Sequence, residues 1–415
     1  MFTICFKNIL KTRTSAPFNF NSKESFILFF KYFLNFTYSA ICYININHMH
    51  FNLSVKNDLS KGRLVKINKD VRDTFERDRD RVLHSTAFRK LKDKTQVFMF
   101  EKGDYYRNRL THTLEVAQLA RSLSRRLGLN EDLSEVIALS HDLGHTPFGH
   151  AGEEIIIQEL DENFNHNVQS FRQVTLLEKK YIDYDGLNLS WETLDGIIKH
   201  NGPVLSTNYN FDLSENFNFN LILNPSLEAQ VATICDDIAY IAHDFDDALR
   251  SKVISIDQIK KLKSFFKISK YEIIDTADMD IFRNNITRFL INFLILDVFH
   301  QTNKNISHYN INDHLDVVHC NQFLVQFSDE SKVLVSELKK FLYDNFYTSD
   351  LVTKGKDNAQ SIVSFLIKFL MNDEKYLPAS WLEKINDDES KKRVIIDYIC
   401  GMTDQFSINF YNNNV

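Results

Sequence analysis

Residues 140–150 read Ser-His-Asp-Leu-Gly-His-Thr-Pro-Phe-Gly-His and crowd three histidines and one aspartate into a single short stretch. Two glycines and a proline interrupt it, so the stretch predicts the end of a helix followed by a tight turn. Burying these polar side chains without partners would cost on the order of several kcal/mol. A metal ion supplies a partner, because neutral imidazole and carboxylate suit divalent Mn, Fe, Ni, Co, Zn or Mg.

The composition around this stretch favours an all-α fold. The 415-residue chain contains only 11 Gly and 5 Pro, too few turn-makers for a many-stranded sheet. Its hydrophobic content of 44% is enough to bury a large core. Long helices joined by short polar loops are therefore expected.

Net charge and cysteine content argue against a general nucleic-acid-binding protein and against a protein stabilised by disulfides or structural zinc. A formal charge of −6 gives the whole molecule no general attraction for nucleic acid, so phosphate recognition must be local. The five cysteines are odd in number, far apart and without a CxxC pair. This spacing argues against a disulfide framework and a structural zinc site, and it favours a reducing cytoplasm.

We expect three regions along the chain: an extension over 1–48, a catalytic helical domain over 60–250, and a helical C-terminal region over 251–415 packed on that domain. Eight of the fourteen histidines lie between His84 and His243, so the chemistry is assigned to the middle region. Helical patterns continue in the third region, at 290–299, 333–346 and 359–371.

The extension is apolar over 26–34, but Lys31 breaks the run and no small-residue cleavage site follows cleanly. We therefore expect no membrane span in it. Met49 offers another explanation, as the true start of the protein, because charged sequence with helical patterning begins soon after it.

Two further segments carry candidate ligands. Residues 107–127 predict a buried helix, which includes His112 within Arg107-Asn-Arg-Leu-Thr-His-Thr-Leu-Glu115. Residues 226–250 predict an amphipathic helix on which Asp236, Tyr240 and Asp244 recur every four residues, opposite the apolar stripe. We expect the other carboxylates of this helix to form a solvated acidic face: Asp237, Asp246 and Asp247.

A single His, an adjacent His-Asp pair and a distant Asp together resemble the ligand pattern of the HD superfamily, an all-α helical bundle, here followed by additional C-terminal helices. Two more stretches narrow the likeness: Arg77 to Phe98, and Asp397-Tyr-Ile-Cys-Gly-Met-Thr-Asp-Gln-Phe406. With them the chain resembles the bacterial deoxyguanosine triphosphate triphosphohydrolase family, in its shorter dGTPase-like branch, from about residue 60 to about residue 410.

The resemblance implies roles for individual residues. Asp236 is preferred to Asp237 as a ligand because the family places a Tyr, here Tyr240, four residues after its ligand Asp. The catalytic histidine would be His150, oriented by Glu153. The metal ligands would be His112, His141, Asp142 and Asp236. The substrate contacts would be Gln96, Tyr240 and Asp244 beside the deoxyribose, and Arg109, His145, His166 and Lys199-His200 on the phosphate side.

The implied reaction is hydrolysis of dGTP, or of several deoxynucleoside triphosphates, to the deoxynucleoside and tripolyphosphate with a divalent metal ion. The resemblance also implies a cytoplasmic homo-oligomer, a dNTP activator and single-stranded DNA as a partner. Two alternatives stay open: an HD phosphohydrolase of other nucleotide specificity, and a non-catalytic nucleotide or single-strand binding module built on the basic stretch Arg77 to Lys94 with Phe88 and Phe98.

Overall fold

The computed structural model describes residues 50–67, 71–97, 106–204, 219–259, 261–262 and 278–415. Within these ranges the regular structure is helical, and the structure contains two isolated β-bridges but no β-sheet there. The predicted all-α fold is confirmed. No helix in these ranges is long and apolar enough to cross a membrane. The expectations for 1–48 and for Met49 as the start lie outside the described residues.

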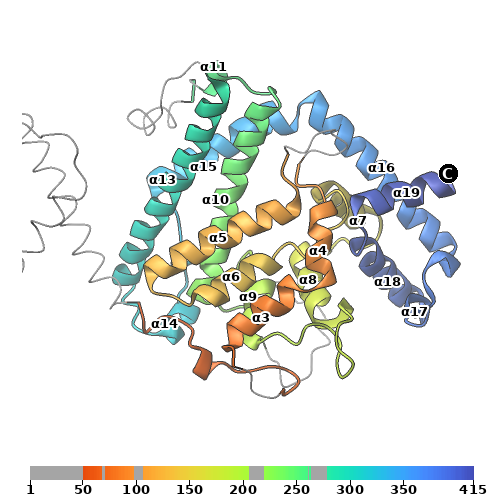
Figure 1. The fold of residues 1–415 in the computed structure, drawn as a ribbon, viewed down its shortest axis with the longest axis horizontal. Coiled ribbons are helices and arrows are strands. Elements are labelled where there is room, and N and C mark those ends of the chain that lie inside the picture. The colour runs from red at the N-terminus through yellow and green to blue at the C-terminus, as the bar shows by residue number, and fades with distance from the viewer. Residues whose placement is uncertain (1–49, 68–70, 98–105, 205–218, 260, 263–277) are drawn as a thin grey trace, which may run out of the picture. The chain divides into compact units, whose positions relative to one another are not determined.

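Three helices form the centre of the fold: α5 (Arg109–Leu127), α6 (Glu131–Ser140) and α10 (Leu227–Arg250), each packed against the other two (Figure 1). The side chain of Asn108 caps the start of α5, and Gly128, at φ 73°, ends it in the left-handed conformation that glycine tolerates best. The helices predicted over 107–127 and 226–250 thus match α5 and α10 to within two residues at each end.

Further helices surround this centre. On the N-terminal side they are η1 (Asn57–Leu59), α3 (Thr74–Leu83), α4 (Thr86–Lys90) and η2 (Leu91–Asp93). Between α6 and α10 they are α7 (His150–Glu159), α8 (His166–Arg172), the π-helical η3 (Gln173–Leu177) and α9 (Trp191–Ile198). After α10 they are α11 (Ile256–Ile259), α13 (Met279–His308), α14 (His314–His319), α15 (Asp329–Leu342), the π-helical η4 (Tyr343–Tyr347), α16 (Asp350–Asn372), η5 (Glu374–Tyr376), α17 (Ala379–Leu382), α18 (Asp388–Cys400) and α19 (Asp404–Asn414).

The helices predicted in the C-terminal region are confirmed: 290–299 lies within α13, 333–346 within α15 and η4, and 359–371 within α16. The domain boundaries that we expect stay a prediction.

A second apolar core joins the C-terminal helices to α7, the helix that follows the histidine-rich turn. Ile156 of α7 packs in one buried cluster with Leu366 of α16 and Ile395 of α18. In Figure 1, α16, α18 and α19 accordingly lie beside α7. Burial of this apolar surface fixes α7 and, with it, the turn that carries the candidate site.

Candidate functional site

A cavity of about 500 Å³ opens between α5, α7, α10 and η4. Apart from Lys199 and His200, which are described below, nine of the twelve predicted site residues line it: Gln96, Arg109, His112, Asp142, His145, His150, His166, Asp236 and Tyr240. The other three, His141, Glu153 and Asp244, lie behind the lining and contact residues of it. The structure thus gathers the predicted residues around a single space.

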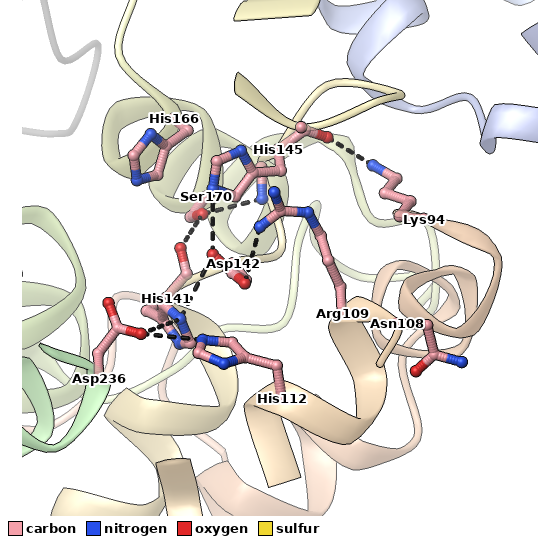
Figure 2. A network of polar contacts seen from close by, with 12 residues as sticks. Lys94, Asn108, Arg109, His112, His141, Asp142, His145, His166, Ser170 and Asp236 are labelled. Carbon is pink, nitrogen blue, oxygen red and sulfur yellow. Dashed lines mark hydrogen bonds and ion pairs between the residues drawn. The ribbon is translucent and has the colours of Figure 1, made fainter. Parts of the chain in front are cut away.

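Three of the predicted ligands converge from three elements (Figure 2). Asp236 on α10 places Oδ1 2.9 Å from Nε2 of His112 on α5 and 3.6 Å from Nε2 of His141 at the end of α6. The ligand atoms of these three residues all lie within 4.8 Å of one another. Asp142 places Oδ1 3.3 Å from the same nitrogen of His141.

The hydrogen bonding of His141 fits a metal ligand. Its Nδ1 lies 2.6 Å from the carbonyl oxygen of Ala138, which can only accept, so Nδ1 carries the proton. The opposite nitrogen, Nε2, is buried, has no hydrogen-bond partner and faces the carboxylates of Asp236 and Asp142. A backbone carbonyl that fixes the tautomer of a histidine in this way is typical of metal ligation.

Carboxylate charge dominates this side of the cavity. Burial alone would lower the pKa of His141, but Asp142 and Asp236 raise it. Burial alone would raise the pKa of Asp236, yet His141 and His112 hold it well below its usual range. Two ionised carboxylates beside two imidazoles form a donor set that suits a divalent cation.

Arg109 lies next to these carboxylates and still has donors to spare. Its Nη1 donates to Asp142 Oδ2 at 2.9 Å, whereas its buried Nε and Nη2 have no hydrogen-bond partner. Gly149, at φ 58°, makes room for the guanidinium, because a Cβ there would lie 2.4 Å from Nη2 of Arg109. An anion in the cavity would satisfy the spare donors.

The remaining histidines face Arg109 from the turn and from α7 and α8. The rings of His145 and His166 stack with centroids 4.1 Å apart, and His150 meets His145 edge-on at 5.2 Å. Burial, followed by the charges of Arg109 and His166, holds the pKa of His145 well below its usual range. Desolvation, followed by Arg109, also lowers the pKa of His150.

The position of Glu153 differs from the expectation that it orients His150. Its carboxylate lies 3.1 Å from Nδ1 of His166 and accepts from the backbone N–H of His166 at 3.2 Å. Glu153 lies one turn into α7, and from there it reaches the start of α8. The pairing is therefore Glu153 with His166, and His150 contacts the other two histidines through its ring.

Tyr347 of η4 lines the cavity and was missed by the sequence reasoning. Its ring stacks on that of Tyr240 with centroids 6.3 Å apart, and its hydroxyl donates to Asp244 Oδ2. Burial raises the pKa of Asp244 to about 7. Asp244 therefore anchors Tyr347 from behind the cavity lining. Gln96 also lines the cavity, and its buried Oε1 has no hydrogen-bond partner.

The expectation of a solvated acidic face on α10 was wrong for two of its three carboxylates. Asp246 and Asp247 are 3% and 2% exposed. Arg107 pairs with both, at 2.7 and 3.3 Å, and Arg283 of α13 pairs with Asp246. Since these arginines supply the compensating charge, the carboxylates can be buried. Asp237 is partly exposed, as expected.

His200 and Lys199, which we expected on the phosphate side, have separate surroundings. His200 lines the cavity, stacks on His141 at 5.0 Å and places Nε2 3.4 Å from Oδ2 of Asp236. Lys199 is buried in an ion pair with Asp195 at 2.7 Å. His200 therefore belongs with the carboxylates, and Lys199 lies outside the cavity lining.

The C-terminal stretch singled out in the sequence holds the histidine-rich turn in place. Asp404 accepts from the backbone N–H of Phe148 at 2.8 Å and from that of Thr95 at 2.7 Å. Lys94, which sequence reasoning also missed as a functional residue, donates to the carbonyl oxygen of His145 at 2.6 Å (Figure 2). Through these contacts, the two stretches on which the family resemblance rests, around Lys94 and Asp404, both hold the turn within residues 140–150.

Comparison with known proteins agrees with this architecture. Residues 109–241, which include every predicted metal ligand, match the HD domain, and residues 325–413 match the phosphohydrolase-associated domain. The helical fold and the His–Asp cluster thus define an HD-domain phosphohydrolase.

Curated relatives narrow the class. The deoxyguanosinetriphosphate triphosphohydrolase-like protein of Rickettsia rickettsii (strain Iowa) is 43% identical over 365 residues, which cover 85% of this chain and 94% of the relative. The protein of the same name from Rickettsia bellii (strain RML369-C) is 44% identical over 365 residues, with the same shares of both chains. The chain belongs to the deoxyguanosinetriphosphate triphosphohydrolase-like family.

Proposed function

We propose that the protein hydrolyses deoxynucleoside triphosphates to the deoxynucleoside and tripolyphosphate, with a divalent metal ion. The observation that carries the proposal is the arrangement around Asp142. Its Oδ1 lies 3.3 Å from His141 on the carboxylate-rich side and 3.1 Å from His145 on the histidine side, while Oδ2 accepts from Arg109. A position suited to a cation and a position suited to an anion would thus adjoin in one cavity, and this arrangement supports hydrolysis of a phosphate ester. The names of the relatives support a deoxynucleotide as the substrate.

The metal ion would be held by His112, His141, Asp142 and Asp236, of which the unpartnered Nε2 of His141 is the best-prepared donor. When bound, a divalent cation lowers the pKa of water and withdraws charge from a phosphate oxygen. The backbone carbonyl of Ala138 keeps the imidazole of His141 oriented toward this position.

Phosphate binding is assigned to Arg109, His145 and His166. The spare Nε and Nη2 donors of Arg109 would each take a phosphate oxygen, and the unpartnered Nδ1 of His145 would donate to the same group once the phosphate charge brings a second proton to the ring. Glu153 keeps His166 turned toward the cavity through its bond to Nδ1. Because Arg109 is 1% exposed, its charge acts in a desolvated space where it is least screened.

His150 is assigned to the proton transfer. Attack of a water oxygen on the α-phosphorus forms one P–O bond and releases a proton from the water, while the bond to the 5′ oxygen breaks and this oxygen takes up a proton as it leaves. His150 stands exposed in the cavity at the first position of α7 and can donate that proton. Its pKa is lowered in the free protein, first by desolvation, and the negative charge of a bound triphosphate would raise its proton affinity.

The sugar is assigned to Tyr240, Tyr347 and Gln96, which line the same cavity. The stacked tyrosines offer an apolar surface to the deoxyribose ring, and Asp244 holds the hydroxyl of Tyr347 behind it. The unpartnered Oε1 of Gln96 offers an acceptor for a sugar hydroxyl. A cavity of about 500 Å³ has the size of small-molecule sites in general.

The alternative of a non-catalytic strand-binding module on Arg77 to Lys94 finds little support. Phe88 is 8% exposed and belongs to the core, so it offers no face for stacking a base. Arg79 is held in an ion pair with Asp132 at 2.6 Å. Phe98 lies outside the described residues. Homo-oligomers, an activating dNTP and single-stranded DNA as a partner stay predictions.

The test is a panel of the four dNTPs with Mn²⁺, run with and without a second dNTP, with the phosphate products separated by ion exchange. The proposal expects tripolyphosphate and deoxynucleoside in equal amounts. Orthophosphate or pyrophosphate without tripolyphosphate would favour an HD phosphohydrolase of another specificity. A double variant, His141→Ala with Asp142→Ala, controls for a contaminating enzyme, since it must be inactive.

A further inference from the structure

Behind His112, on the side away from the cavity, three more polar side chains form a line. Nδ1 of His112 lies 3.4 Å from Nδ1 of His243 on α10. Nε2 of His243 lies 2.9 Å from Oε2 of Glu115 on α5, and the same oxygen accepts from Nε of Arg107 at 3.0 Å. His243 is 2% exposed, so its ring has little access to water.

With a metal ion shared by Nε2 of His112 and Asp236, one distribution of protons satisfies the contacts from His112 to Glu115. If Nε2 of His112 offers a lone pair to a metal, its proton must be on Nδ1, which then donates to Nδ1 of His243. His243 must therefore carry its own proton on Nε2, and that nitrogen faces a carboxylate, Glu115, which can only accept. The opposite distribution would leave the lone pair of His243 Nε2 against the carboxylate of Glu115.

The charge of Glu115 is well supported. Burial alone would raise its pKa, but the contacts with His243 and Arg107 lower it to about 2. Arg107 is itself fixed by Asp246 at 2.7 Å and Asp247 at 3.3 Å on α10. The acceptor at the end of the line is thus ionised and anchored between two helices.

We propose that His243 and Glu115 are positioning residues that hold His112 in the tautomer whose Nε2 presents a lone pair to the metal. The inference rests on the metal centre of the proposed function and adds to it the groups that prepare one of its ligands. Histidine ligands commonly donate their other N–H to a carboxylate or carbonyl. His141 uses the carbonyl of Ala138, whereas His112 reaches a carboxylate through a second imidazole.

The test measures binding of Mn²⁺ to the metal-free full-length protein by electron paramagnetic resonance, which detects the free ion. His243→Phe removes the acceptor and keeps a ring, and His243→Asn restores an acceptor oxygen near the position of Nδ1. We expect His243→Phe to weaken Mn²⁺ binding about tenfold to a hundredfold, and His243→Asn to stay within about threefold of the wild type because its acceptor is retained.

His50→Phe is the matched control, since His50 is a fully buried histidine with one side-chain hydrogen bond, to Asn303, and lies outside the cavity lining. It should bind Mn²⁺ like the wild type. Equal binding by the wild type and His243→Phe would overturn the inference, and so would a His243→Asn variant as weak as His243→Phe.

Glu115→Ala keeps the test decisive if His243→Phe does not fold, because the side chain of Glu115 is 46% exposed and tolerates replacement. We expect it to weaken Mn²⁺ binding about threefold or more, and unchanged binding would count against the inference. His141→Ala distinguishes a failure of the proposed metal centre from a failure of the proposed role of His243 and Glu115. If it binds Mn²⁺ as tightly as the wild type, the metal centre itself is wrong; if it alone loses Mn²⁺, only the role of His243 and Glu115 fails.

Discussion

His141 and His145 are four residues apart in one turn, and each is 2% exposed, yet their pKa values shift in opposite directions. Burial lowers both. Asp142 and Asp236 overcome its effect at His141, whereas Arg109 and His166 reinforce it at His145. The sign of the surrounding charge therefore distinguishes two sides of the cavity: a carboxylate side, with His112, His141, Asp142 and Asp236, and a cationic side, with Arg109, His145, His150 and His166.

This difference indicates what each side can bind. A cation is favoured beside the carboxylates and a phosphate beside the arginine, so a metal-bound phosphate ester would lie across both. Asp142 belongs to both sides, because its two oxygens contact His141, His145 and Arg109. Variants that affect one side alone can test whether the two sides are separate in function.

The largest effect is expected on the carboxylate side. His141→Ala removes the donor whose Nε2 is held ready by the carbonyl of Ala138. Mn²⁺ binding should be lost and hydrolysis should fall by roughly a thousandfold or more, since a catalytic metal contributes several kcal/mol. Calorimetric Mn²⁺ titration and steady-state kinetics measure both. Retained activity in a folded, metal-free variant would contradict the assignment.

On the cationic side, His150→Gln should slow catalysis without changing metal binding on the carboxylate side. The variant removes the proton donor but leaves the carboxylates intact, so we expect kcat to fall about a hundredfold or more while Mn²⁺ affinity stays unchanged. The kcat and KM for dGTP, together with a Mn²⁺ titration, provide the comparison. A parallel loss of Mn²⁺ binding would mean that the sides do not act independently.

Gly149→Ala should have a smaller effect, through Arg109. A Cβ at this position would lie 2.4 Å from Nη2 of Arg109, and the guanidinium must move. We expect kcat/KM to fall roughly tenfold to a hundredfold. Gly62→Ala is the matched control, because Gly62 also has a positive φ, 89°, but nothing lies within 4 Å of its Cβ position. Equal losses in both variants would assign the effect to backbone strain.

The smallest effect is expected at Asp244, which belongs to neither side. Its pKa, raised by burial to about 7, lies above that of an unfolded Asp, about 3.9. The folded state therefore holds the proton more tightly, and the stabilisation present below about pH 4 is lost as the pH rises to about 7.

Asp244→Asn cannot titrate, so its stability should fall less over this pH range, by a difference on the order of a few kcal/mol. Urea unfolding of both proteins at pH 5 and pH 7.5 measures the difference. If the unfolding free energies of the two proteins changed equally between pH 5 and pH 7.5, Asp244 would be ionised throughout this range.

Sequence periodicity was sufficient for the central helices and their ligands. The spacing of apolar residues predicted α10 over 226–250, against the observed Leu227–Arg250, and placed Asp236 and Tyr240 on one face. The Gly and Pro residues of the turn predicted that a helix ends before Gly144, and α6 ends at Ser140. These features depend on interactions between near neighbours in the chain.

The contacts that sequence reasoning missed join distant segments. Tyr347 meets Asp244 across 103 positions and Lys94 meets Cys400 across 306. Periodicity identifies the face on which a residue lies but not its partner on another helix. The same reason accounts for the error at Asp246, since Arg283, which permits its burial, comes from α13.

The central claim is most directly tested by hydrolysis of dGTP in H₂¹⁸O with Mn²⁺, followed by mass spectrometry of the products. Attack of water on the α-phosphorus predicts one ¹⁸O atom in tripolyphosphate and none in deoxyguanosine. Label in orthophosphate or pyrophosphate would place the cut elsewhere along the phosphate chain, and label in deoxyguanosine would place the broken bond on the sugar side of the 5′ oxygen. Either result would contradict the proposed function.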